Sequence, residues 1–207
     1  EQRDDDSRAI LSGLTVGGTN GLTLGGVVSG AGALIKDGLA NLTLDGTNTF
    51  TGGTSLNAGT LTLGTAGALG AGPLTVGGAA TLDTSATFTL GNGIALNGDL
   101  TLAGNNDLNL SGVISGASTL IKNGLADLTL SGNNTFTGPL NIVSGSVTTG
   151  STGALGSTSG VDVSAGAALN LGVDSSLAGL SGAGGVAVGG GLNLTVGGVS
   201  TSSTFDG

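Results

Sequence analysis

The chain has 207 residues, of which 45 are glycine, and its formal net charge is −9. It contains no His, Cys, Met, Trp or Tyr, which excludes disulfides, thiol nucleophiles, Cys/His zinc sites and imidazole bases. With four basic residues against 13 acidic ones, the chain offers no basic patch for nucleic acid. Frequent glycine disfavours helices, whereas frequent Thr and Val favour strands.

Residues 1–8 are strongly charged, which predicts a disordered tail or an expression remnant. Residues 9–207 predict one β-rich unit. That unit repeats a triplet of apolar, Thr and apolar residues, in which both apolar side chains face one way. The triplets are Leu14–Val16, Leu22–Leu24, Leu42–Leu44, Leu61–Leu63, Leu74–Val76, Leu100–Leu102 and Leu128–Leu130.

Many triplets lie about 20 residues apart and are separated by Gly-rich turn sequences, a spacing typical of solenoids. We therefore predict a right-handed, single-stranded parallel β-helix of about 9–10 coils, with glycine supplying positive φ at the corners. The alternative is a β-sandwich, which also has many short strands. Four Phe and no Trp or Tyr would fill a wide sandwich core poorly.

A longer repeat aligns residues 26–70 with residues 112–156 at an offset of 86 residues, and 27 of the 45 aligned positions are identical. A decayed third copy begins near Ser181. The first copy contains the motif residues Gly26, Ser29, Gly30, Lys36, Gly38, Leu42, Leu44, Gly46, Asn48, Thr49, Phe50 and Gly52. The second contains Gly112, Ser115, Gly116, Lys122, Gly124, Leu128, Leu130, Gly132, Asn134, Thr135, Phe136 and Gly138.

This string resembles the passenger-associated transport repeat of autotransporters, with Ala40 and Ala126 at a usual Gly and Phe50 and Phe136 at a usual Tyr. The resemblance implies a parallel β-helix at the surface of a Gram-negative bacterium or outside the cell. It also implies two partners, the remainder of a passenger and a C-terminal translocator barrel. We expect a piece of a passenger, without that barrel or a secretion signal.

The function expected from the resemblance is a structural stalk that supports secretion, folding and surface display. The alternative is an adhesin or self-association module that contacts another copy or a host or bacterial surface. A glycan-acting enzyme is the third possibility.

The residues favour a non-enzymatic chain without cofactor or metal. The acidic positions change between repeats, as Asp37 becomes Asn123 and Asp45 becomes Ser131, which is typical of solvated turns rather than paired catalytic carboxylates. The nonapeptide of calcium-binding β-rolls is missing. We expect Lys36 and Lys122 to be solvated, with their stems covering apolar surface. We expect Asn48 and Asn134 at coil corners, with Phe50 and Phe136 turned inward.

Overall fold

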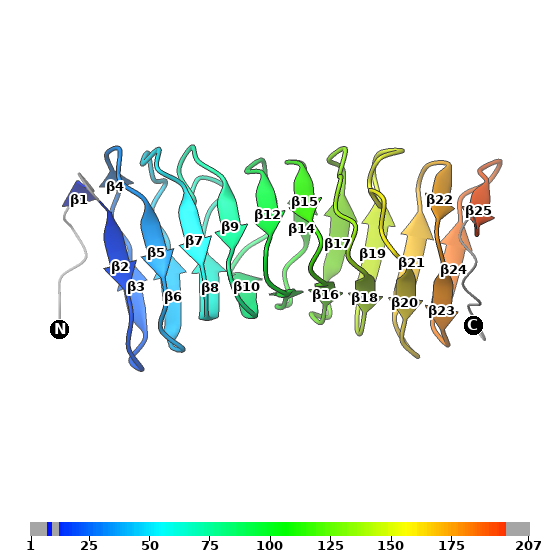
Figure 1. Cartoon of the computed structure of the whole chain (residues 1–207), viewed down its shortest axis with the longest axis horizontal. Coiled ribbons are helices and arrows are strands. Elements are labelled where there is room, and N and C mark those ends of the chain that lie inside the picture. The colour runs from blue at the N-terminus through cyan, green and yellow to red at the C-terminus, as the bar shows by residue number, and fades with distance from the viewer. Residues whose placement is uncertain (1–7, 10–12, 198–207) are drawn as a thin grey trace.

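The computed structural model describes residues 8–9 and 13–197. These residues form 25 short strands, β1 to β25, and no helix. All strand pairs are parallel. The coils stack along one axis, so the molecule is a rod with its two ends far apart (Figure 1). No helix capable of crossing a lipid bilayer occurs in the described part of the chain.

One sheet of nine strands, which we call the long face, runs along most of the rod. Its strands are β3 (Leu22–Leu24), β6 (Asn41–Leu44), β8 (Gly59–Leu63), β10 (Ala80–Thr84), β13 (Leu100–Leu102), β16 (Leu120–Lys122), β18 (Leu140–Ile142), β20 (Val161–Val163) and β23 (Leu180–Gly182). Leu42 pairs with Leu22 on one side and with Leu61 on the other, so one coil takes about 20 residues. The predicted parallel β-helix is confirmed, with about nine coils.

Two six-stranded sheets form the other sides. The second face contains β2 (Leu14–Val16), β5 (Leu34–Lys36), β7 (Thr54–Leu56), β9 (Leu74–Val76), β12 (Ile94–Leu96) and β15 (Ile114–Gly116). The third face contains β11 (Phe88–Leu90), β14 (Leu108–Leu110), β17 (Asp127–Leu130), β19 (Ser146–Thr149), β21 (Ala168–Leu171) and β24 (Gly185–Val188). Two short sheets pair β1 (Arg8–Ala9) with β4 (Val28–Ser29), and β22 (Ser175–Leu177) with β25 (Leu194–Val196).

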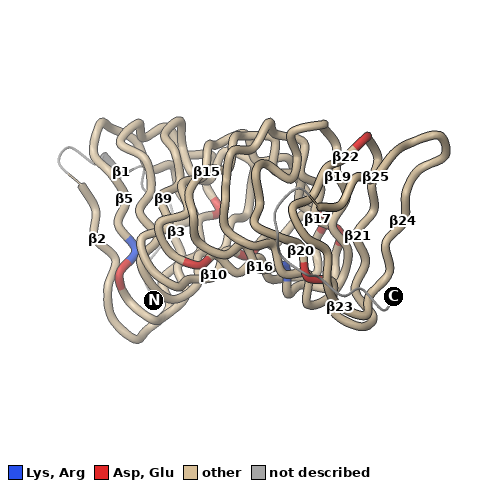
Figure 2. Tube along the Cα trace, turned by 45° about the vertical axis from the view of Figure 1, so that its right-hand side comes forward, with Lys and Arg blue, Asp and Glu red and all other residues tan. Residues whose placement is uncertain are grey.

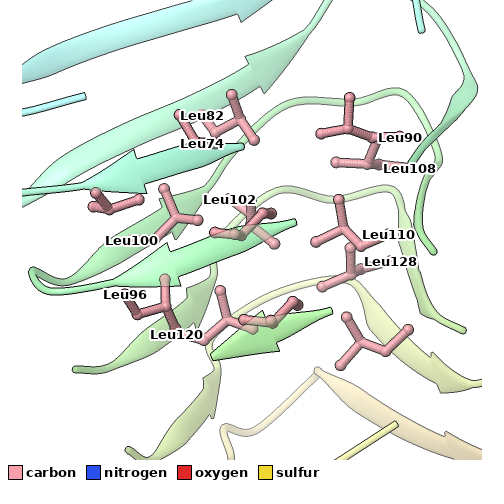
Figure 3. Close-up of a cluster of buried hydrophobic side chains, with 14 of the residues drawn as sticks. Leu74, Leu82, Leu90, Leu96, Leu100, Leu102, Leu108, Leu110, Leu120 and Leu128 are labelled. Carbon is pink, nitrogen blue, oxygen red and sulfur yellow. The ribbon is translucent and has the colours of Figure 1, made fainter. Parts of the chain in front are cut away.

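The interior is a stack of leucine, valine and isoleucine side chains contributed by every coil. In β13, Leu100 and Leu102 are buried while Thr101 between them is partly exposed, as the period of two predicts. Leucines of successive coils lie above one another: Leu82 pairs with Leu102, and Leu90 pairs with Leu110 (Figure 3). Each coil therefore buries its apolar residues against the coils before and after it.

Glycine serves the fold in two ways, of which the sequence predicted one. Gly59 and Gly145 adopt positive φ, at +72° and +70°, as expected at corners. Gly46 and Gly132 do not, and a Cβ at either position would clash with the carbonyl oxygen of Gly26 or Gly112 in the preceding coil. At these repeat positions, glycine is needed because two backbones approach closely.

The ends of the predicted unit fall partly outside the described residues. Of the predicted tail, residues 1–7 lie outside them, and Arg8 begins β1. Residues 10–12 and 198–207 of the predicted β-rich unit also lie outside the described residues. The described part of the segment proposed as a decayed repeat copy includes the end of β23 and strands β24 and β25. The division of the chain into a tail and one repeat-containing unit stays a prediction.

Candidate functional site

The two repeats lie on different faces of the rod. Lys36 ends β5 on the second face, whereas Lys122 ends β16 on the long face. Likewise β6 and β8 of the first repeat lie on the long face, and their equivalents β17 and β19 lie on the third face. The offset of 86 residues therefore corresponds to four complete coils plus the step from one face to the next. The second repeat is displaced along the rod by four coils and rotated about its axis onto the neighbouring face.

Both repeat lysines are buried, and their predicted solvation is wrong. Lys36 is 1% exposed and Lys122 is 4% exposed. The Nζ of Lys36 donates to the carbonyl oxygen of Gly38 in the adjoining corner and to that of Ala58 in the next coil, at 3.1 Å. Burial lowers the pKa of Lys36, and the nearby Asp37 carboxylate opposes this shift. The ammonium group thus links the corners of two successive coils.

Lys122 repeats this arrangement on its own face. Its Nζ donates to the carbonyl oxygens of Gly124 and of Ser144, the latter at 3.3 Å. Burial also lowers the pKa of Lys122, and the carboxylates of Asp127 and Asp107 oppose the shift. Sequence reasoning missed the acceptors at Ala58 and Ser144, because a backbone carbonyl can belong to any residue type. The signal that could have indicated these corners is the glycine that follows each acceptor in both repeats, Gly59 and Gly145.

The repeat asparagine spans three coils. Asn48 Oδ1 accepts from the amide of Val28 at 2.8 Å, and its Nδ2 donates to the carbonyl oxygen of Ala68 at 2.6 Å. In the second repeat, Asn134 makes the same two bonds, to Ile114 and Ala154, at the same distances. Each asparagine is buried.

These asparagines lie along a side of the coil rather than at a corner, which corrects the prediction. The amide of Thr49 donates to Val28 of β4, and the amide of Thr135 donates to Ile114 of β15. The segment around each Asn therefore stacks on a strand without forming one itself. The side-chain amide replaces bonds that a regular ladder would supply.

Phe50 and Phe136 are fully buried, as predicted. Each phenylalanine lies below a turn in the next coil. In the turn above Phe50, the amide of Gly70 donates to the carbonyl oxygen of Gly67, and in the turn above Phe136, the amide of Gly156 donates to that of Gly153. That turn contains the Ala-Leu-Gly sequence that ends both repeats.

The remaining motif residues divide between strands, corners and close contacts. Leu42, Leu44, Leu128 and Leu130 are buried in β6 and β17. Ser29 lies in β4, and Ser115 lies in β15 with Gly116. Gly30 and Gly116 have positive φ, while a Cβ at Gly38, Gly52, Gly124 or Gly138 would clash with the preceding coil. Gly26 and Gly112 provide the carbonyls against which Gly46 and Gly132 pack.

One shared residue has no role inside the rod. Leu39 and Leu125 occupy equivalent positions, yet they are 77% and 74% exposed. They provide matched surface positions next to the buried leucines of β6 and β17.

The surface charge of the described rod is negative. Lys36 and Lys122 are the basic residues of the stretch 13–197 and both are buried, whereas none of its aspartates is buried. Most aspartates lie on the long face or at its borders, and Asp174 lies near β22 (Figure 2). Within residues 8–9 and 13–197, no three acidic side chains gather into a group that could hold a metal ion.

Comparison with known proteins gives two matches. The family model described as passenger-associated-transport-repeat matches residues 34–63 and 120–148, the segments that contain the buried lysines. The chain is 36% identical over 154 residues to the adhesin BmaC autotransporter of Brucella suis biovar 1 (strain 1330). That alignment covers 72% of this chain and 4% of the adhesin's length. No solved structure matches the chain.

Both matches agree with the location predicted from the repeats, at the cell surface or outside the cell of a Gram-negative bacterium. The two segments matched by the family model also contain Asn48 and Asn134. The chain is autotransporter passenger sequence that carries two passenger-associated transport repeats.

Proposed function

We propose that this chain is a stalk segment of its passenger and supports secretion, folding and surface display. The observation that carries the proposal is the continuous stacking: among the described strands, each strand of the long face pairs with strands of adjacent coils. In such a solenoid, a finished coil is the template on which the next coil folds. Burial of each coil outside the cell lowers the free energy of the exported chain and opposes its return.

The repeats support the proposed role because the buried asparagine in each of them connects three successive coils. Asn48 links the coils that contain Val28 and Ala68, and Asn134 does the same for Ile114 and Ala154. A three-coil unit held in this way is a stable starting point for further stacking.

The proposed partners are the remainder of the passenger and a C-terminal translocator barrel. The anionic surface argues against nucleic acid as a partner, since phosphate contacts need exposed Lys or Arg. We assign the chain no catalytic role, because it has no His or Cys and its acidic positions change between the two repeats.

The second candidate function is adhesion or self-association. It is supported by the relative, which is named an adhesin, and by neutral outward side chains such as Thr43, Thr62 and Thr101. Bacterial aggregation and surface-binding assays with the displayed protein distinguish it from a pure stalk. Display without aggregation or surface binding supports the stalk alone.

The stalk role is tested by surface display of a full-length passenger in which Leu42, Leu44, Leu128 and Leu130 are replaced by Asp. These side chains are buried, so four carboxylates prevent stacking and we expect display to stall. The matched control replaces the exposed Leu39 and Leu125 by Asp and keeps normal display. Normal display of the buried variant would refute the proposal.

A further inference from the structure

The alignment of neighbouring coils is poorly specified by their apolar residues alone. In the native pairing of β6 with β8, Leu42 faces Leu61 and Thr43 faces Thr62. The β8 sequence is Gly-Thr-Leu-Thr-Leu, so a shift of two residues pairs Thr43 with Thr60 and Leu44 with Leu61. Leucines still point inward and threonines outward after this shift. Strand register is weakly fixed where the side-chain pattern allows such slippage.

The buried lysine next to these strands does not tolerate the shift. Lys36 Nζ bonds the carbonyl of Gly38, just before β6, and the carbonyl of Ala58, just before β8. A slip of two residues displaces Ala58 by about 7 Å along the strand direction. The amine would then be buried without its second acceptor, and an unpaired buried polar group is costly.

The same pairing problem and the same lysine occur in the second repeat. There β17 pairs with β19, so that Asp127 faces Ser146 and Thr129 faces Thr148. Lys122 Nζ bonds Gly124 and Ser144, which precede these two strands as Gly38 and Ala58 precede β6 and β8. Since the two repeats lie on different faces, the arrangement belongs to the repeat and not to one side of the rod.

We propose that Lys36 and Lys122 determine the register of neighbouring coils. Each lysine selects the native alignment because slipped alternatives bury its amine without the acceptor in the next coil. The lysine thus serves specificity, in the manner of a buried polar group that disfavours competing arrangements. This inference depends on the fold and not on the proposed stalk role.

The chain has no cysteine, so engineered cysteine pairs can report the register during refolding from urea with oxidised and reduced glutathione. A Thr43→Cys/Thr62→Cys pair lies in native register and forms a disulfide. A Thr43→Cys/Thr60→Cys pair is diagonal, about 8 Å apart between Cα atoms, which is too far to bridge unless the strands slip. In the Lys36→Met background, we expect the diagonal disulfide to increase several-fold at the expense of the native one.

The second repeat supplies the matched control. A Thr129→Cys/Ser146→Cys pair is diagonal there, and its disulfide should stay low in Lys36→Met and rise in Lys122→Met. If Lys36→Met leaves both first-repeat pairs at wild-type levels, the proposal is wrong. If it lowers both pairs together, the lysine is needed for folding itself and the register role is equally refuted.

Discussion

The repeats and the coils between them use the same apolar interior but close their coils differently. From Leu74 to Leu110, each coil has a strand on every side, in the order β9, β10, β11 and then β12, β13, β14. In this stretch the buried polar side chain is Thr84. The two repeats contain six of the other buried polar side chains: Lys36, Asn48, Thr54, Lys122, Asn134 and Thr149.

This difference shows what a coil needs when one of its sides is not a strand. The segment at Asn48 lies on β4 without forming a strand, and the asparagine amide bonds backbone groups of the coils on either side. The strands of the intervening coils pair in ladders with adjacent coils. There, the partly buried Asn92 and Asn106 add bonds to backbone carbonyls of the preceding coil. The repeats therefore differ in placing their specific polar side chains in the buried interior.

The largest difference in stability between the repeats and the intervening coils is expected when a phenylalanine is replaced. Phe136 is fully buried under the turn of the next coil, whereas Phe88 in the intervening stretch is only partly buried. Phe136→Ala should lower the free energy of unfolding by about 3–5 kcal/mol, because it removes a core ring and leaves a cavity. Phe88→Ala should cost about 1 kcal/mol. Urea unfolding of both variants tests this prediction. Equal losses in the free energy of unfolding would show that the core of the repeat is no more sensitive to truncation than the intervening coils.

A smaller contrast is expected from two glycines. A Cβ at Gly132 would clash with the carbonyl of Gly112, so Gly132→Ala should destabilise by about 1–3 kcal/mol as backbones separate. At Gly93 the nearest atom to a Cβ is the carbonyl oxygen of Val113, at an ordinary 3.6 Å, and φ is not positive. Gly93→Ala should be neutral or stabilise by about 0.4–1 kcal/mol, because it restricts the unfolded chain. Thermal unfolding that ranks the two variants the other way would contradict the close-approach explanation.

The sequence predicted the fold because the solenoid follows a simple rule at every level. Triplets such as Leu42–Leu44 and Leu100–Leu102 have the period of a strand, and their spacing of about 20 residues gives the coil. The repeats and their inward phenylalanines could also be found from identity between the two copies.

The lysines could not be placed in this way, because pattern reasoning assigns a charged side chain to solvent. Lys36 follows Leu34 at the period of two, and strict alternation would have put it inside. What makes this position acceptable is the set of carbonyls in two corners, which belong to different coils. The faces on which the two repeats lie could not be predicted either. They depend on the exact number of residues in each coil, which varies by a residue or two along the rod.

The smallest expected effect is a pH dependence that only the repeats can produce. Burial lowers the pKa of Lys36 and Lys122 below the ordinary 10.5, so between the folded and unfolded pKa values the unfolded chain binds more protons. The free energy of unfolding therefore rises with pH through this interval and levels off above about 10.5. Because the chain lacks His, Cys and Tyr, no other side chain titrates from neutral pH to this limit.

The urea midpoint should increase from pH 7 towards about 10.5 in the wild type and stay flat in Lys36→Met/Lys122→Met. A rise of equal size in the double variant would mean that the buried amines are not its source, and a wild-type midpoint that falls over this range would contradict the direction of the pKa shifts.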